Sequence, residues 1–316
     1  ASGELRYFYR LSGDDKEREA PNGNPIWDDI DQEYVLPRSR TFIPALLADN
    51  PYLGDDYLST LQLMPEPLRS ALKNGSWAAM ITDDAYQVIP SAWIKAAMDR
   101  WRPTGMMVEG KLVPKQKELT TLGADVARGG QDYTALCPRY GAWFGKLETH
   151  PGSATRTGGA VVTHMLPYMQ VGEDPLTKEP VYDGMANIDV IGIGASVYDN
   201  ATDNGMPATP VNFAEGSDYT DRSGRLKFVN KRAEGYWRLR EALSPELPVS
   251  EWIALPPDTE LYGDLSAPRW VMTVRGVKIE EKEDIHKRLG RSPDKGDAVV
   301  LANMEGVNPL SLIAFS

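Results

Sequence analysis

The stretch LTTLGADVARGGQDYTAL, residues 119–136, predicts a strand, a Gly-Gly turn and a second strand. In the first strand Leu122 and Ala124 alternate with Gly123 and Asp125, so the carboxylate of Asp125 projects from one face. Asp is uncommon in strands, and burying an unpaired carboxylate is costly unless a positive partner meets it. A bound metal ion would be such a partner, and acids embedded in other apolar segments are candidates to share it.

A regular alternation of elements follows this stretch. An antiparallel meander of three strands is expected at 119–127, 132–140 and 142–149. Further strands are expected at 186–194 and 208–213, and helices are expected at 158–170, 195–202 and 230–243. A meander followed by alternating helices and strands predicts an α/β fold with a mixed sheet and helices on both faces.

The front of the chain has a different pattern. Residues 1–40 predict short strands and turns, residues 45–80 predict short helices interrupted by Pro65 and Pro67, and residues 91–102 predict one more helix. The segment 103–117 is rich in Gly, Pro and Lys, which is typical of a boundary. We therefore expect two domains, 1–115 and 116–316. Because the chain begins at Ala, we expect an excised piece with an upstream domain missing.

Composition limits the chemistry. The 316 residues include one cysteine and three scattered histidines, so we expect neither a multi-cysteine zinc site nor a His-rich site. A metal ion would then be bound by oxygen ligands. The net charge of −11 argues against broad coating of nucleic acid, although the stretch 222–240 is locally basic. No apolar run is long enough to cross a bilayer, and the first ten residues are too charged for a signal peptide, so no membrane partner is expected.

Two further aspartates repeat the pattern of Asp125. Asp189 lies in the apolar run MANIDVIGIG (185–194); alternatively, it hydrogen-bonds the turn that follows. Asp297 lies in a late helix, expected to have Ser292 at its N-cap and Pro293 at its first position. A carboxylate near a helix N-terminus gains roughly 0.3 to 1 kcal/mol from the helix dipole, and capping explains Asp294 in this way.

Asp297 differs from Asp294 in its position on the helix. It shares a stripe with Leu301 and Met304, the stripe that should face the sheet. Asp132, across the Gly-Gly turn from Asp125, is a further candidate ligand; alternatively, it is a loop residue. Carboxylate oxygens suit Mg²⁺ or Mn²⁺, and two such ions can promote cleavage of a phosphodiester without any histidine.

Three short motifs follow one another along the chain: LGADVARGGQDYTAL (122–136), IDVIGIGASVYDNA (188–201) and RSPDKGDAVVLA (291–302). They are preceded by SRTFIPALLADNPYL (39–53) and YLSTLQLMPEPLRSALKNGSW (57–77). In order and spacing these segments resemble the large terminase subunit of tailed bacteriophages, the motor and nuclease that packages viral DNA. The first three resemble its nuclease motifs, and the other two resemble the segment that joins its ATPase to its nuclease.

The resemblance implies an RNase H-like nuclease domain, similar also to Holliday-junction resolvases. It implies that Asp125 on the first strand, Asp189 on the fourth and Asp297 on the last helix are catalytic and bind Mg²⁺ or Mn²⁺, with Asp132 and Asp294 as further candidate ligands. It also implies concatemeric double-stranded DNA as substrate, the small terminase subunit and the portal protein as partners, and the host cytoplasm, not the mature virion, as location.

One feature of the family is missing. Its ATPase needs a glycine-rich loop with GK[ST], which does not occur in this sequence. We therefore expect no ATPase activity from this piece, and residues 1 to about 60 resemble the tail of the family's ATPase domain.

Basic side chains that could contact phosphates gather in two places. The first is an expected helix with one basic face. Its other face is the expected buried stripe, formed by Ala233, Tyr236, Leu239 and Leu243. The candidates for DNA contact are Arg222, Arg225, Lys227, Lys231, Arg232, Arg238, Lys282 and Lys287. A solvated basic face is the alternative for the first group, and a salt-bridged helix surface for the last two. No base-reading module is evident, so cleavage with little sequence preference is expected.

Two rival functions remain open. The chain could be an assembly module of a packaging motor that docks on the portal or the small subunit, with acids that only cap helices and accept hydrogen bonds. It could also be a resolvase-like enzyme on the same scaffold, which would cut branched DNA.

Overall fold

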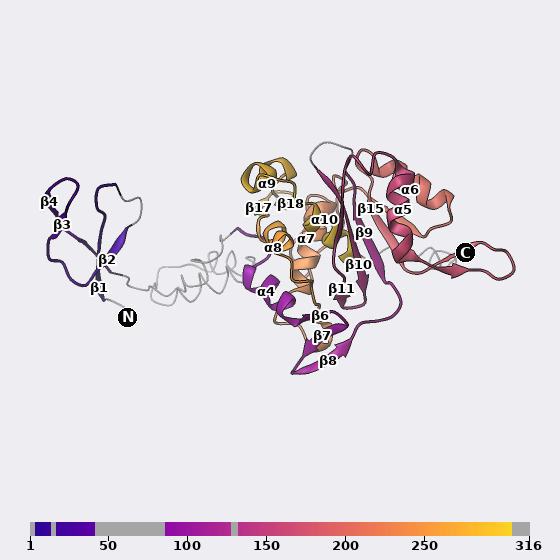
Figure 1. The fold of residues 1–316 in the computed structure, drawn as a ribbon, viewed down its shortest axis with the longest axis horizontal. Helices are drawn as coiled ribbons and strands as arrows, with labels where there is room; N and C mark the ends of the chain where they lie inside the picture. The colour runs from indigo at the N-terminus through magenta and orange to yellow at the C-terminus, as the bar shows by residue number, and fades with distance from the viewer. Residues whose placement is uncertain (1–3, 14–16, 42–85, 128–131, 305–316) are drawn as a thin grey trace. The chain divides into compact units, whose positions relative to one another are not determined.

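The computed structural model describes residues 4–13, 17–41, 86–127 and 132–304 (Figure 1). The chain divides into two compact units, Ala1–Ile81 and Thr82–Ser316. The second unit includes the segment 86–115, which packs with later elements of the chain, and the domain division after residue 115 stays a prediction. The helical segment expected at 45–80 and the Gly-Gly turn at 129–130 lie outside the described residues.

The first unit has the short strands and turns that the sequence predicts. Strand β1 (Leu5–Tyr9) pairs antiparallel with β2 (Arg18–Ala20) and β5 (Arg38–Thr41), and β3 (Ile26–Asp28) pairs with β4 (Glu33–Val35). Among the described residues of this unit, the buried polar one is Asp28. Its carboxylate accepts hydrogen bonds from the backbone nitrogens of Ser12 at 2.6 Å and Ile30 at 2.9 Å. These bonds compensate its burial.

A mixed sheet is the centre of the second unit. Its main strand order is β11 (Trp143–Phe144), β10 (Tyr133–Tyr140), β9 (Thr121–Asp125), β15 (Met185–Asp189) and β16 (Ala208–Val211). β12 (Glu148–Pro151) also pairs with β10. The first pairings are antiparallel, whereas β15 is parallel to both β9 and β16. The meander is confirmed, but its third strand is split into β11 and β12.

Helices α5 (Gly158–Met169) and α6 (Gly194–Asp203) cover one face of this sheet (Figure 1). Helix α5 begins where the Thr157 hydroxyl accepts a hydrogen bond from the Ala160 backbone nitrogen. Leu122 and Ala124 point into the core between sheet and helices, where a fully buried leucine side chain contributes about 1.5 to 3 kcal/mol. Residues 121, 123 and 125 of β9 therefore face the other side.

Helix α10 (Asp294–Asn303) lies against that other side, very close to β9. A Cβ at Gly123 would lie 2.1 Å from the Ala298 carbonyl oxygen, so only glycine permits this approach. The Thr121 hydroxyl donates to the Ala302 carbonyl at 2.6 Å, and Asn187 Nδ2 donates to the carbonyl of Leu301 at 2.9 Å. The sheet thus caps the C-terminal end of α10 with side chains.

Helices α7 (Lys231–Ala242) and α8 (Thr259–Ser266) pack on α10. Because α10 is enclosed, residues on most of its sides are buried, where the sequence suggested a single buried stripe. The helix also begins one residue later than expected, with Pro293 and not Ser292 at its N-cap.

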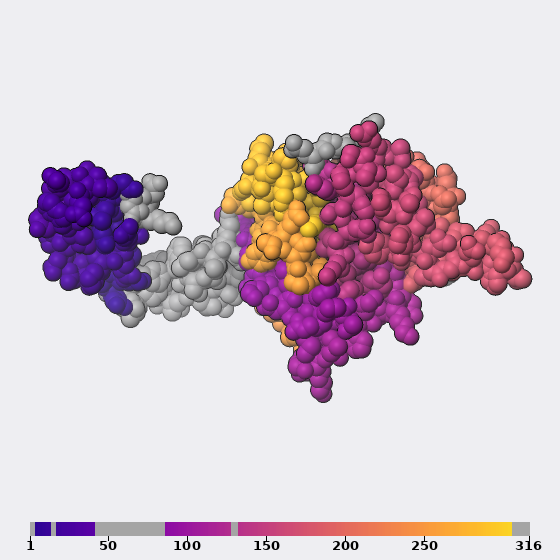
Figure 2. Space-filling model, in the orientation of Figure 1, coloured from indigo at the N-terminus to yellow at the C-terminus, as the bar shows by residue number. Residues whose placement is uncertain are grey.

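Smaller elements complete the second unit. Helix α4 (Ser91–Arg100) leads into the sheet of β6 (Trp101–Arg102), β7 (Gly105–Val108) and β8 (Lys111–Pro114). β13 (Gln170–Glu173) pairs with β14 (Pro180–Tyr182), β17 (Trp270–Thr273) pairs with β18 (Gly276–Ile279), a 3₁₀ helix spans Val249–Glu251, and α9 is Lys282–Leu289. The hairpin of β7 and β8 protrudes from the surface (Figure 2). None of the helices in the described ranges combines the length and apolarity needed to span a bilayer.

Candidate metal centre

Two of the predicted aspartates lie at the carboxyl ends of adjacent strands. β9 and β15 run parallel, and their register pairs Ala124 with Ile188, so Asp125 and Asp189 follow side by side. Alternation places both side chains on the face that α10 covers. Asp125 is 5% exposed, and Asp189 is partly buried with Oδ1 accepting a hydrogen bond from the Ile191 backbone nitrogen at 3.1 Å.

The ammonium group of Lys282 lies among three carboxylates. Lys282 Nζ is 3.0 Å from Asp125 Oδ2, 3.1 Å from Asp297 Oδ2 and 3.3 Å from Asp294 Oδ1. It comes from the first residue of α9, whereas the aspartates come from β9 and α10. Acids from two distant parts of the sequence therefore converge on one positive charge.

Asp297 is held from the opposite side by α7. Arg232 Nη1 donates to Asp297 Oδ1 at 2.9 Å, and the Tyr236 hydroxyl donates to the same oxygen at 2.8 Å. Arg232 and Tyr236 are four residues apart, so they share one face of α7. Asp297 is 1% exposed, and its Oδ2 is buried without a hydrogen bond to any described residue. That oxygen lies 3.1 Å from Lys282 Nζ, within the group of carboxylates around the ammonium.

The environment shifts the acidity of these groups in opposite directions. Burial raises the pKa of Asp125 well above its usual value, although Lys282 works against this, and burial raises the pKa of Asp189 to about 6. Burial alone would also raise the pKa of Asp297, but Arg232 and Lys282 outweigh it and hold that pKa below its usual value. Asp297 is therefore charged at neutral pH, and the cluster needs positive charge to ionise fully.

The two further candidates lie differently. Asp294 is buried, and its Oδ2 accepts a hydrogen bond from the Tyr133 backbone nitrogen at 3.1 Å while Oδ1 faces Lys282. Asp294 lies in the first turn of α10, where the helix dipole favours a carboxylate, but α10 has no side-chain cap hydrogen bond. Asp132 is exposed and lines a cavity of about 360 Å³ together with Tyr133, Asp294 and Lys295. Its carboxylate makes no ion pair with Lys282.

The basic residues proposed for DNA contact do not all lie on the surface. Arg232 is 8% exposed and paired with Asp297, and Lys282 lies among the carboxylates, so neither is a simple surface cation. The remaining six are exposed or half-buried: Arg222, Arg225, Lys227, Lys231, Arg238 and Lys287. Four of them pair with acids of their own neighbourhood: Arg222 with Glu251, Lys231 and Arg238 with Glu234, and Lys287 with Asp284.

The roles of Lys282, Arg232 and Tyr236 could not be read as such from the sequence. Tyr236 was assigned to the buried stripe, which is correct, but its hydroxyl bond to Asp297 was not foreseen. One signal was available: an Arg and a Tyr at i and i+4 on a buried stripe both need an acceptor, and a buried acid elsewhere can supply it.

The residues present fit a hard divalent cation. Their donors are carboxylate oxygens, the kind that Mg²⁺ and Mn²⁺ prefer, and one of these oxygens is buried without a hydrogen bond in the described structure. A cationic group of the chain itself, Lys282 Nζ, already lies within 3.3 Å of three of the acids. The cluster thus attracts positive charge.

Comparison with known proteins identifies the fold. No protein-family model and no curated protein matches the sequence. A solved structure of a mutant nuclease domain of the large terminase subunit gp2 of bacterial virus Sf6, with manganese and β-thujaplicinol, is similar at a TM-score of 0.50 and 15% identity. The similarity covers 69% of this chain and 98% of that one.

Two other solved structures are similar over the same region. The nuclease domain of Sf6 gp2 has a TM-score of 0.49 and 17% identity over 69% of this chain and 98% of its own. The large terminase nuclease from thermophilic phage G20c with bound magnesium has a TM-score of 0.39 and 16% identity, over 66% and 95%. The fold is that of a terminase nuclease domain and is RNase H-like, as the sequence resemblance implied.

Proposed function

We propose that this chain is a divalent-metal-dependent DNA endonuclease of the terminase type. The observation that carries the proposal is the convergence of Asp125, Asp294 and Asp297 on Lys282 Nζ, with Asp189 beside Asp125. The similarity of fold to a nuclease domain solved with manganese supports it. Burying several carboxylates around one ammonium group is costly for stability, which favours a functional role for the cluster.

Asp125, Asp189 and Asp297 would hold Mg²⁺ or Mn²⁺, and Asp294 flanks them. Bound there, a pair of such ions would supply activation of water and stabilisation of the leaving oxygen in phosphodiester hydrolysis. The contribution of Arg232 and Tyr236 is to fix Asp297: their two hydrogen bonds to Oδ1 leave Oδ2 directed into the cluster. These two residues position the site and need not touch DNA.

Lys282 has a different part in the proposal. Its side chain is 36% exposed, so the ammonium can move outward while its aliphatic stem stays in contact. A bound cation would take over the compensation of the carboxylates, and the displaced ammonium could pair with a backbone phosphate. Lys282 would thus compensate the acids before substrate binds and contact the substrate afterwards.

The substrate and partners follow the same proposal. Arg222, Arg225, Lys227, Lys231, Arg238 and Lys287 are the proposed phosphate contacts, and because they would contact the backbone, little sequence preference is expected. We propose concatemeric double-stranded DNA as substrate, the small terminase subunit and portal protein as partners, and the host cytoplasm as location. ATP hydrolysis is not expected from these 316 residues, since they contain no GK[ST] loop.

A plasmid-cleavage assay tests the proposal. With Mn²⁺ or Mg²⁺ the protein should nick or linearise supercoiled plasmid, and Asp125→Asn and Asp297→Asn should each abolish cleavage while circular dichroism stays unchanged. Asp203→Asn, an exposed acid on α6 across the sheet, is the matched control and should cleave normally. Cleavage that survives both cluster variants would refute the site. Faster cutting of branched DNA than of plasmid would instead favour the resolvase-like reading.

One observation favours a second function, the assembly module. Lys282 already compensates three acids, and Asp189 Oδ1 accepts a backbone hydrogen bond, so part of the cluster is satisfied without a metal. A module of this kind would show neither cleavage nor a rise in melting temperature with Mn²⁺. The endonuclease would show both, and Asp297→Asn would remove both.

A further inference from the structure

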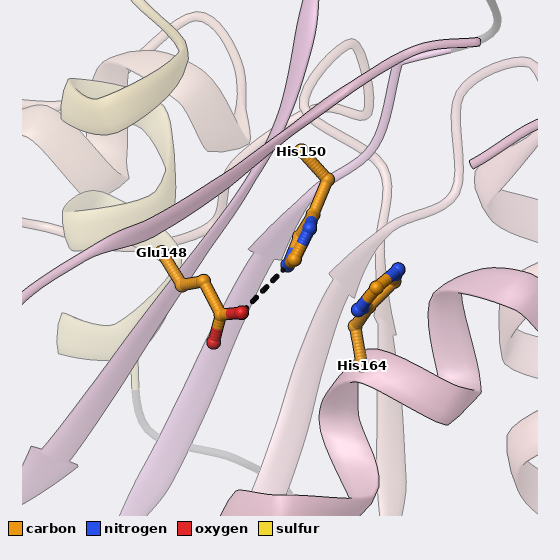
Figure 3. Close-up of side chains that lie close together, drawn as sticks. All are labelled: Glu148, His150 and His164. Atoms are coloured by element: carbon orange, nitrogen blue, oxygen red, sulfur yellow. Dashed lines mark ion pairs between the residues drawn. The ribbon is translucent and has the colours of Figure 1, made fainter. Parts of the chain in front are cut away.

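A second group of ligand-type side chains lies on the other side of the central sheet. Glu148 and His150 alternate with exposed Thr149 on β12, so both project from the same face of that strand. His164 reaches them from α5, the helix that covers this face. Figure 3 shows the three side chains gathered between strand and helix.

The ligand atoms are close together. One nitrogen of each imidazole and one carboxylate oxygen all lie within 4.8 Å of one another. His150 Nε2 is 3.0 Å from Glu148 Oε1, and the imidazole rings of His150 and His164 stack with centroids 3.6 Å apart and planes at 24°. Although Nε2 is buried at ion-pair distance from the carboxylate, it makes no hydrogen bond with any described residue. The imidazole and the carboxylate are therefore in close contact without the geometry of a good hydrogen bond.

A neighbouring tyrosine fixes the carboxylate. The Tyr168 hydroxyl donates to Glu148 Oε2 at 2.5 Å, and Tyr168 follows His164 by one turn of α5. This bond occupies Oε2 and leaves Oε1 directed at His150. Metal ligands are commonly oriented by a hydrogen bond of this kind from an outer residue.

This group is separate from the carboxylates around Lys282. In the register of β10 with β12, His150 pairs with Thr134 and Thr149 with Ala135, and Ala135 in turn pairs with Asp125. Asp125 therefore shares its face of the sheet with Thr149, and Glu148 and His150 point to the opposite face. Two of the three histidines of the chain meet here, although they are scattered in the sequence.

We propose that Glu148, His150 and His164 form a second metal site, which binds a borderline first-row cation, Zn²⁺ by preference. Two imidazole nitrogens and one carboxylate oxygen are a ligand set that zinc accepts, with a fourth position left for water. Ligand atoms of tetrahedral zinc lie roughly 3.3 Å apart, given bond lengths near 2.1 Å. Small side-chain rotations would bring atoms now within 4.8 Å to that spacing.

The site would tie the edge of the sheet to its covering helix. β12 pairs on one side with β10, and no other described strand pairs with it. A cation bound to Glu148 and His150 on the strand and to His164 on the helix would link β12 to α5 directly.

Binding of Zn²⁺ and Co²⁺ to the full chain tests the proposal. Calorimetry in excess Mg²⁺, which keeps the oxygen-rich site filled, should show one equivalent of Zn²⁺ bound. His164→Gln and His150→Gln should each weaken this binding at least tenfold, and Tyr168→Phe about tenfold. His286→Gln, the exposed third histidine on α9, is the matched control and should bind as wild type does.

The visible spectrum of Co²⁺ gives a readout that does not depend on folding energetics. Co²⁺ at the histidines should give the intense bands of a four- or five-coordinate nitrogen site, and His164→Gln should remove them. Weak bands of a six-coordinate oxygen site alone, or Zn²⁺ binding unchanged in both histidine variants, would overturn the proposal. Since the measurement needs no nuclease activity, its outcome is independent of the proposed function.

Discussion

Arg232 and Asp297 form an ion pair of 2.9 Å between Nη1 and Oδ1, with side chains only 10% and 1% exposed. One residue comes from α7 and the other from α10, so the pair links two helices that enclose the carboxylate cluster. Because the Tyr236 hydroxyl donates to the same oxygen, the orientation of Asp297 is fixed before any ligand binds. The key acid of the site is thus held by the fold itself.

Replacing Arg232 should destabilise the protein strongly. Arg232→Met leaves the Asp297 carboxylate buried without its main partner, and such changes cost about 3 to 5 kcal/mol. Urea denaturation would measure the loss. The double variant Arg232→Met, Asp297→Asn should recover part of it, because no charge is then left unpaired. Arg238→Met should cost less than Arg232→Met, about 1 kcal/mol, because Arg238 is 26% exposed and Glu234 keeps Lys231 as a second partner. Equal losses for the two arginines would contradict this account.

Replacing Lys282 should make stability depend on metal. Lys282→Gln removes the charge that compensates three acids, and because the side chain is 36% exposed the cost should be about 1 to 2 kcal/mol, below that of a buried pair. Mn²⁺ should then raise the melting temperature of the variant more than that of wild type, since cation and ammonium no longer compete. Lys287 is exposed on the same helix, and Lys287→Gln is the control. Its melting temperature should match that of wild type with and without Mn²⁺. A smaller Mn²⁺ shift in Lys282→Gln would argue against competition.

Gly123→Ala should damage both stability and metal binding. The added Cβ would lie 2.1 Å from the Ala298 carbonyl oxygen and 2.5 Å from the Ala302 backbone nitrogen, so α10 must move away from β9. Overpacking of this kind typically costs about 1 to 3 kcal/mol, and displacement of Asp297 should weaken Mn²⁺ binding as well. Gly172→Ala, where a Cβ would meet nothing within 4 Å, is the control. Wild-type Mn²⁺ affinity in Gly123→Ala would show that α10 need not lie so close.

Acid should weaken the metal-free protein through His150. Its folded pKa lies below 6.5 because of burial and His164, with Glu148 acting in the opposite direction, so the unfolded chain binds the proton more readily. The stabilising contribution of neutral His150 is present above pH 6.5 and is lost as the pH falls through that value towards the folded pKa. Melting temperatures in EDTA at about pH 7.5 and about pH 5.5 measure it. His150→Gln should shrink the difference and His286→Gln should not; equal differences in both would exclude His150 as the source.

Local patterns predicted much of the fold and the placement of the acids. The meander at β9 and β10, the helices α5, α6 and α7, and the parallel strand β15 follow from alternation and helical periodicity. The prediction that Asp125 is buried was correct, because this residue lies inside an apolar strand segment that the sequence alone reveals. Asp297 was placed correctly for an incomplete reason, since α10 is enclosed and its buried residues exceed a single stripe.

What could not be predicted depends on contacts between distant segments. Arg232 and Lys282 look like surface cations in sequence, and only the packing of α7 and α9 around α10 brings them to Asp297. His150 and His164 lie on different elements, and their stacking depends on how α5 crosses β12. The segment 86–115 belongs to the second compact unit, because α4 packs on α8 and Trp101 of β6 stacks on Trp143.

The late position of α10 in the chain also determines when the group of acids can form during synthesis. The last described helix supplies Asp294 and Asp297, so a ribosome must translate nearly all of the described chain before those acids can join Asp125 and Asp189. A chain whose synthesis stops before α10 would have the central sheet but would lack Asp294 and Asp297. On the proposed function, cutting activity would thus arise only after α10 has been synthesised.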